Sequence, residues 1–196
     1  MKELARRHAG KWSKAARAVL DRSGSTAVEF ALLVPPFLGL VFSVFEVGWF
    51  YFANSQLDAA TLRGARFIRT GQVAEAGLDK QQFFNAVCPP LKIFGQDCGD
   101  FLTVEVREFQ NFKALAADKS AAVCTNDDES KINAIKYEPG NDGSIIQIRL
   151  CMVYKTFNPA LGVNLSDSTN GTRRLYGTYL FRNEPYSRKS NSSAGN

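Results

Sequence analysis

The hydrophobic pattern of this chain is dominated by one apolar stretch near the N-terminus, from Gly24 to Phe52. No charged residue lies between Phe30 and Phe45, and Leu, Val and Phe supply eleven of these sixteen positions. At about 1.5 Å per helical residue, Phe30 to Phe52 spans about 34 Å, enough to cross a hydrocarbon layer about 30 Å thick. Buried core helices of soluble proteins are rarely apolar on all faces. The stretch therefore predicts a transmembrane helix that begins near Ser25 or Thr26.

Beyond this stretch the helical pattern continues, but it becomes two-sided. Small and apolar residues recur at helical spacing along one face, and three arginines occupy another. A glycine follows at position 71, where it is suited to end the helix. The apolar face consists of Leu57, Thr61, Gly64, Ala65 and Ile68, and the other face carries Arg63, Arg66 and Arg69. The pattern predicts one long helix whose first half lies in lipid and whose second half packs against a soluble domain.

From Gln72 onward the pattern is that of a small globular domain. Residues 78–87 suit a short helix that stops at Cys88 and two prolines. Alternation of apolar and polar residues predicts strands over residues 101–109, 144–156 and 173–182. The polar stretches 111–133 and 158–170 read as loops, the first with one helical turn. The fold class is α+β, with an antiparallel sheet of three or four strands covering the outer half of the long helix.

Two prolines and two carboxylates interrupt the apolar stretch. Pro35 and Pro36 remove two backbone donors and predict a kink or an unwound turn. Glu29 lies at the start of the stretch and Glu46 near its aromatic end. An ionised carboxylate in hydrocarbon costs about 2.5 kcal/mol or more, so each is a candidate functional group. The alternative for Glu29 is an acid that favours the helix N-terminus and reaches toward the membrane surface.

Positive charge is concentrated at the N-terminus. Residues 1–23 hold seven Lys or Arg and two acidic side chains, whereas the remaining chain holds seventeen of each. The main domain therefore lacks the electrostatic support that nucleic-acid binding requires. A basic leader before an apolar span predicts a cytoplasmic N-terminus, although Arg63, Arg66 and Arg69 follow the span. A cleaved signal peptide is the competing interpretation, but its apolar region is shorter and ends in small residues.

All four cysteines lie after the apolar stretch, at positions 88, 98, 124 and 151. An even number confined to this part favours two disulfides in an oxidising compartment. Three pairings are open, of which Cys88–Cys98 with Cys124–Cys151 is the simplest in sequence order. Some of the four could instead be buried free thiols. Their spacings are too wide for a structural zinc site.

The chemistry needed by common enzymes is missing from the main domain. The only histidine is His8, in the basic leader, so neither Ser-His-Asp nor Cys-His catalysis nor a His-ligated metal site can form there. The acidic run 126–129 lacks the alternating ligand spacing of a calcium loop and reads as a solvated turn. No phosphate-cradling glycine loop is present. We therefore expect no enzyme activity, no cofactor and no metal.

The junction between leader and helix has a distinctive order of residues. A glycine is followed by the small-residue run Ser25-Thr26-Ala27 and then by Glu29-Phe30, which opens the apolar helix with its prolines. Phe45-Glu46-Val47-Gly48, Gly64-Ala65-Arg66 and the late segment 181–185 continue the likeness. Over residues 22–70 the chain resembles the TadE-like pseudopilins of tight-adherence (Flp) pilus systems, and over the remainder the likeness is diffuse.

This resemblance implies a pilin-like route into the membrane. A membrane prepilin peptidase would cut between Gly24 and Ser25 on the cytoplasmic side and release the basic leader. The cut would create an amine at Ser25, with Glu29 about one turn away. In pilin-like packing such a carboxylate is thought to pair with the new amine of a neighbouring subunit, which would offset the desolvation of both charges.

The resulting hypothesis is a minor pseudopilin or pilus-assembly factor, anchored once in the bacterial inner membrane with its C-terminal domain in the periplasm. Its expected partners are membrane lipid, other pilins and the prepilin peptidase, and no nucleic acid or small-molecule substrate. The alternative is a signal-anchored binding or sensor domain, with an exported enzyme as a third reading. The expected segments are a leader (1–24), a transmembrane helix (25–53), a helix extension (54–71), an exported α+β domain (72–186) and a flexible tail (187–196).

Overall fold

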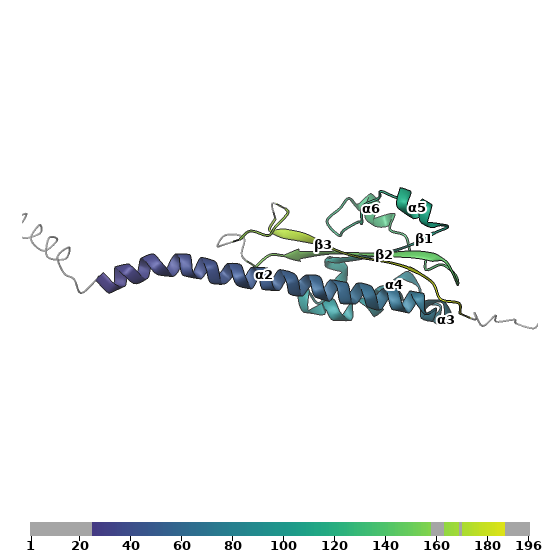
Figure 1. Cartoon of the computed structure of the whole chain (residues 1–196), viewed down its shortest axis with the longest axis horizontal. Helices are drawn as coiled ribbons and strands as arrows, with labels where there is room; N and C mark the ends of the chain where they lie inside the picture. Colours follow the sequence, from purple (N-terminus) through teal and green to yellow (C-terminus); the bar gives the residue numbers. More distant parts are fainter. Residues whose placement is uncertain (1–24, 158–162, 169, 187–196) are drawn as a thin grey trace, which may run out of the picture.

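A computed structural model describes residues 25–157, 163–168 and 170–186 (Figure 1). The long helix α2 is followed by a small domain of short helices and three strands. The expected α+β fold, with a long apolar N-terminal helix and a small antiparallel sheet, is therefore confirmed. In chain order the elements are α2 (Ser25–Arg69), α3 (Gln72–Ala76), α4 (Lys80–Val87), the 3₁₀ helices η2 (Pro89–Phe94) and η3 (Cys98–Asp100), β1 (Leu102–Phe109), α5 (Phe112–Ala117), α6 (Glu129–Asn133), β2 (Ile145–Lys155) and β3 (Thr172–Arg182).

Helix α2 runs as one unbroken ribbon of 45 residues (Figure 1). It continues through Pro35 and Pro36 without an unwound turn, so that part of the expectation is wrong. Prolines are tolerated in membrane helices where neighbouring groups or local adjustment satisfy the freed carbonyls. The kink at these prolines stays a prediction.

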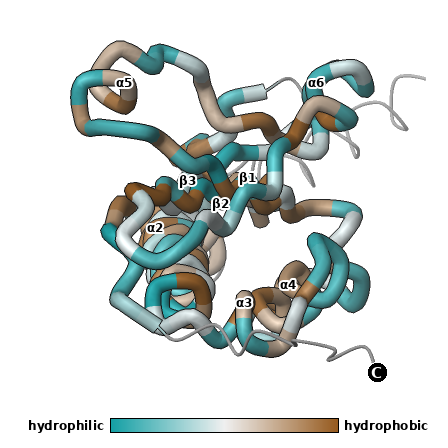
Figure 2. Tube along the Cα trace, turned by 90° about the vertical axis from the view of Figure 1, so that its right-hand side faces the viewer, coloured by the Kyte–Doolittle hydropathy of each residue, from teal (hydrophilic) through white to brown (hydrophobic). Residues whose placement is uncertain are grey.

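The three strands form an antiparallel sheet in the order β1-β2-β3. Figure 2 shows this sheet lying between α2, α3 and α4 on one face and the segment with α5 and α6 on the other. In the register, Val106 lies opposite Ile148, and Ile148 lies opposite Tyr179. Because side chains alternate along a strand, the apolar residues of β1 and β2 gather on the face toward α2. The core therefore lies between the sheet and the outer half of α2.

The face of α2 predicted to be apolar is the one that the sheet covers. Leu57, Thr61, Ala65 and Ile68 are all buried, and the three arginines of the other face are exposed or partly exposed. Helix α4 and η2 close the core from the side and contribute Phe83, Val87 and Leu91. Helix α4 begins at a capping box in which Asp79 accepts from the backbone of Gln82 and the Gln82 side chain accepts from the backbone of Asp79.

The C-terminal end of α2 is held by the last described segment of the chain. The backbone N–H of Glu184 donates to the carbonyl of Arg69 at 2.9 Å, and the Arg69 guanidinium pairs with the Glu184 carboxylate at 3.0 Å. Asn183 is buried and donates to the carbonyls of Pro139 and Asn141. The late motif 181–185 therefore lies at the end of the helix, where it satisfies an otherwise unpaired carbonyl.

Strand β3 crosses α2 at a glycine. A Cβ at Gly177 would lie 2.2 Å from Oγ1 of Thr61, so only glycine lets the two elements approach this closely. We predict that Gly177→Ala lowers the free energy of unfolding of the detergent-solubilised protein by about 1–3 kcal/mol, because the sheet must move off the helix. Chemical denaturation followed by circular dichroism measures this change.

Gly48→Ala is the matched control, because a Cβ at Gly48 would meet no atom within 4 Å. It should be neutral or stabilise α2 by up to about 1 kcal/mol. Adding Thr61→Ala to Gly177→Ala should recover part of the loss. Equal effects of the two glycine substitutions would contradict the close crossing.

Candidate functional site

In the first half of α2, residues 26–45 are all exposed or partly exposed. Phe30 and Phe45, at the two ends of the uncharged run, are 69% and 71% exposed. Of the residues that the structure describes, α2 is the one helix long and apolar enough to span a membrane, and its most apolar window is not buried. Exposure of this much apolar surface is unfavourable in water, so this half of the helix is suited to a lipid environment.

The small domain reaches α2 earlier than the expected end of the span at residue 53. The backbone N–H of Val163 donates to Oγ of Ser43 at 3.2 Å. Three residues further on, Glu46 is only 1% exposed, and Ala53 is fully buried. The residues of α2 that precede Glu46, from Ser25 to Phe45, would span about 31 Å at the rise of an α-helix.

The Glu46 carboxylate is the polar centre of this helix–sheet junction. Its Oε2 accepts from the backbone N–H of Phe157 at 2.9 Å, and its Oε1 accepts from the hydroxyl of Tyr154 at 3.4 Å. Burial, followed by the nearby Glu46 carboxylate, raises the pKa of Tyr154 to about 12. The tyrosine therefore stays protonated as a donor. The junction attaches the end of β2 to α2 at the position where the exposed part of the helix ends.

Aromatic side chains of α2 make the contacts with the domain at the same level. The ring of Trp49 lies 5.4 Å from that of Phe94 in η2 and 5.0 Å from that of Phe157 after β2, in edge-to-face contacts. The Arg173 guanidinium of β3 stacks 4.8 Å above the ring of Phe50. Three segments that are distant in the sequence thus converge on one turn of α2. Such rings are typical of membrane–water interfaces.

The other predicted site lies at the start of α2. Ser25 is the first residue of the helix, whereas Gly24 lies outside the described residues. Glu29 is exposed on the first turns of α2, on the part of the helix that the sheet does not cover. The structure thus separates the two carboxylates. Glu29 lies on the exposed segment, and Glu46 is enclosed by the domain.

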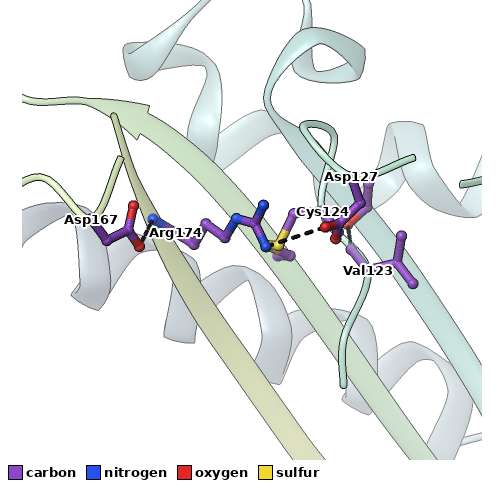
Figure 3. The surroundings of a disulfide bond; sticks show 7 residues. Val123, Cys124, Asp127, Asp167 and Arg174 are labelled. Carbon is purple, nitrogen blue, oxygen red and sulfur yellow. Dashed lines mark hydrogen bonds and ion pairs between the residues drawn. A yellow bond between two sulfur atoms is a disulfide. The ribbon is translucent and has the colours of Figure 1, made fainter. Parts of the chain in front are cut away.

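The four cysteines form two disulfides, Cys88–Cys98 and Cys124–Cys151. The first joins the end of α4 to η3, and the second fastens the loop before α6 to β2 on the sheet face opposite α2. Figure 3 shows Arg174 of β3 reaching toward Asp127 of this loop, with an ion pair of 3.2 Å. Asp127 also accepts from the backbone N–H of Cys124 at 2.8 Å.

A polar network lies beneath the same loop. Arg149 of β2 forms a buried ion pair with Glu105 of β1, 2.6 Å long, and also donates to the carbonyl of Ser120 at 2.6 Å. Arg107 donates to the side chains of Asp118 and Ser120. These groups hold residues 118–124 over the sheet. They stabilise the domain and carry no arrangement suited to catalysis.

Within the described residues no group of three or more His, Cys, Asp or Glu side chains is placed to hold a metal ion. The acidic run 126–129 is a turn, in which Asp127 is engaged by Cys124 and Arg174. Sequence reasoning missed two features, the partners of Glu46 and the Glu105–Arg149 pair. The Glu105–Arg149 pair could have been predicted from the sequence, because both charges fall on the polar positions of predicted strands. The partners of Glu46 could not have been predicted, because one of them is a backbone N–H.

Removal of the Glu46 carboxylate should loosen the junction. We predict that Glu46→Ala lowers the free energy of unfolding by about 2–4 kcal/mol, because the Tyr154 hydroxyl and the Phe157 N–H lose a buried acceptor. Glu46→Gln keeps one acceptor oxygen and should cost roughly half as much. Denaturant titration of the detergent-solubilised protein gives both values.

Asp58→Ala removes an exposed acid from the same helix and should change stability by less than about 0.5 kcal/mol. If Glu46→Ala is no more destabilising than Asp58→Ala, the carboxylate does not support the junction.

The raised pKa of Tyr154 leads to a prediction about the pH dependence of stability. The folded state keeps this tyrosine protonated up to about pH 12, whereas the unfolded state ionises it near pH 10. Its contribution to stability is therefore complete below pH 10 and is lost as the pH rises from about 10 to 12.

Ultraviolet titration should show tyrosines that ionise well above pH 10, with one fewer in Tyr154→Phe and an earlier transition in Glu46→Gln. Burial also raises the pKa of Tyr137 to about 12, so one late tyrosine should remain in Tyr154→Phe. Identical titrations of wild type and Tyr154→Phe would contradict the buried junction.

Comparison with known proteins gives one match. The family model described as TadE-like protein matches residues 24–66, which contain the exposed half of α2, the Glu46 junction and the start of the packed helix. No curated protein and no solved structure matches the chain. TadE-like proteins are components of pilus assembly, so the match supports a role related to a Tad pilus system. The resemblance seen in the sequence is confirmed, and over residues 24–66 this chain is similar to the TadE-like protein family.

Proposed function

We propose that this protein is a minor pseudopilin or pilus-assembly component that is anchored in the bacterial inner membrane and supports biogenesis of a Flp-type pilus. The observation that carries the proposal is the family match to α2, which includes the whole exposed half of this helix. The match extends over most of the packed half of α2 and includes none of the strands. A protein of this kind acts through helix–helix contacts and needs no catalytic group.

The proposed topology is a single pass with the N-terminus in the cytoplasm. The basic leader favours the cytoplasmic side, and the two disulfides favour an oxidising compartment for the sheet domain. We place the hydrocarbon segment between Ser25 and Phe45, with the Ser43–Val163 contact in its last turn, because Glu46 and the sheet end would otherwise enter the lipid. This segment matches a hydrocarbon thickness of about 30 Å.

The proposal includes processing at the start of α2. Cleavage between Gly24 and Ser25 would leave Ser25 as a free amine at the first turn of α2, one turn from Glu29. Glu29 is exposed on the helix. Pairing with the amine of that subunit would offset the cost of placing either charge near lipid. The proposed partners are therefore lipid, a prepilin peptidase and other pilins or pseudopilins.

Mass spectrometry of the mature N-terminus from native membranes tests processing. We expect wild type to begin at Ser25 and Gly24→Arg to retain the leader, because a side chain at position 24 would fill the tight cleavage subsite. In the same cells, Glu29→Ala should reduce recovery of pilin partners by co-purification about tenfold, if the lost pairing is worth roughly 1.4 kcal/mol.

Asp58→Ala is the control for the loss of an acid, since Asp58 lies on the same helix outside the proposed lipid segment. A wild-type protein that retains Met1, together with unchanged partner recovery in Glu29→Ala, would refute the pseudopilin proposal. The span would then be only an anchor for a binding or sensor domain.

A further inference from the structure

The base of the small domain presents apolar side chains toward the exposed half of α2. Two of these come from segments outside α2. Ile93 of η2 is 60% exposed, and Phe157, after β2, is 69% exposed. Together with the aromatic residues on α2 and at the end of η2 they form a cluster beside the turns of α2 that follow Glu46. We call this set the interface ring, and it consists of Trp49, Phe52, Ile93, Phe94 and Phe157.

The members of the interface ring share one level along α2. Trp49 and Phe52 lie within six residues of Glu46, which is about 9 Å along the helix axis. Phe94 is in ring contact with both of them, at 5.4 and 5.9 Å, and Phe157 contacts Trp49. These contacts fix η2 and the end of β2 at the level where the proposed lipid segment ends. The ring is therefore continuous with the lipid-facing surface of α2.

A groove of about 530 Å³ opens between the members of this ring. It is lined by Trp49, Ile93 and Phe94 on one side and by Lys155 and Phe157 on the other. Its wall thus combines apolar rings with an exposed ammonium group. Such a mixture matches the boundary between acyl chains and headgroups, where aromatic residues and lysines are enriched.

Basic groups lie beside the interface ring. Lys155 lines the groove and is exposed, exposed Lys92 precedes Ile93 in η2, and Arg173 stacks on Phe50 at the start of β3. Glu46, three residues before Trp49, is buried and accepts hydrogen bonds from Tyr154 and Phe157. Cations near a membrane surface are attracted to anionic phospholipid headgroups, by about 1 kcal/mol each.

We propose that the interface ring is a second membrane contact, in which the base of the exported domain rests on the phospholipid headgroup layer of the leaflet where α2 emerges. The inference depends on the proposed insertion of α2 in a bilayer, but not on pilus assembly. Lipid is the occupant that the geometry favours, because the ring lies directly beside the end of the lipid segment and has basic groups around it. The contact would fix the tilt of the sheet relative to the membrane.

Quenching of tryptophan by brominated phospholipids tests this contact in the full-length protein. The chain has two tryptophans, Trp12 and Trp49, so Trp12→Phe leaves Trp49 as the reporter of α2 itself. In a Trp12→Phe, Trp49→Phe background, Ile93→Trp and, separately, Phe157→Trp report the base of the domain. The proteins are reconstituted in vesicles of phosphatidylcholine and phosphatidylglycerol with bromines near the headgroup end of the chains.

Phe112→Trp in the same background is the matched control. Phe112 is 61% exposed, much like Ile93, but it lies in α5 on the opposite side of the sheet from α2 (Figure 1). We expect Ile93→Trp and Phe157→Trp to lose as much fluorescence in brominated vesicles as Trp49 does. Phe112→Trp should lose none.

The outcomes separate this inference from the proposed function. If Trp49 is quenched but Ile93→Trp and Phe157→Trp behave like Phe112→Trp, α2 is inserted and the domain stands away from the membrane, so the interface ring proposal is refuted. The proposal would be refuted in this case whether the interface ring is exposed to water or covered by a second copy of the chain. If Trp49 itself is not quenched, the insertion of α2 fails and both proposals fall. Quenching of the two ring positions in a protein that still retains its leader would support the membrane contact and count against processing.

Discussion

The structure depends on one buried carboxylate that ties a membrane-type helix to a sheet. Glu46 accepts hydrogen bonds from the Tyr154 hydroxyl and from the backbone of Phe157, and so joins α2 to the end of β2. A carboxylate enclosed in this way would be costly without those donors. The contact therefore determines where the exposed half of α2 ends and the packed half begins. With α2 inserted as proposed, it would also determine how close to the membrane the sheet lies.

Helix α2 meets two different surroundings along its length. Its first half is apolar on every side, which suits lipid, whereas its second half has a narrow face of small residues that admits the sheet. Thr61 and Gly177 allow the closest approach, because a larger residue on β3 would displace the strand. One continuous helix thus transmits the position of the membrane segment directly to the domain. An anchor joined by a flexible linker would not do this.

The domain gains stability on its other sheet face by covalent and polar contacts. The Cys124–Cys151 bridge and the Glu105–Arg149 pair hold a loop over strands that α2 does not cover. Each disulfide is worth about 3 kcal/mol for loops of this length. The disulfides matter here because much of the apolar surface of the chain lies on the exposed half of α2, outside the core. The sheet face toward α2 packs by apolar contact, and the opposite sheet face is stabilised by a disulfide and by ion pairs.

The sequence alone determined the helix, the three strands and the resemblance to TadE-like proteins, because periodicity and the junction motif are local properties. It placed Glu29 and the Gly24–Ser25 bond as sites, and these remain predictions. It left three disulfide pairings open, since sequence order says little about which loops meet on a sheet. Only the tertiary structure decided the role of Glu46, whose partners lie 108 and 111 residues away. One partner is a backbone N–H, which no residue pattern encodes, so its position depends on how the end of β2 packs against α2.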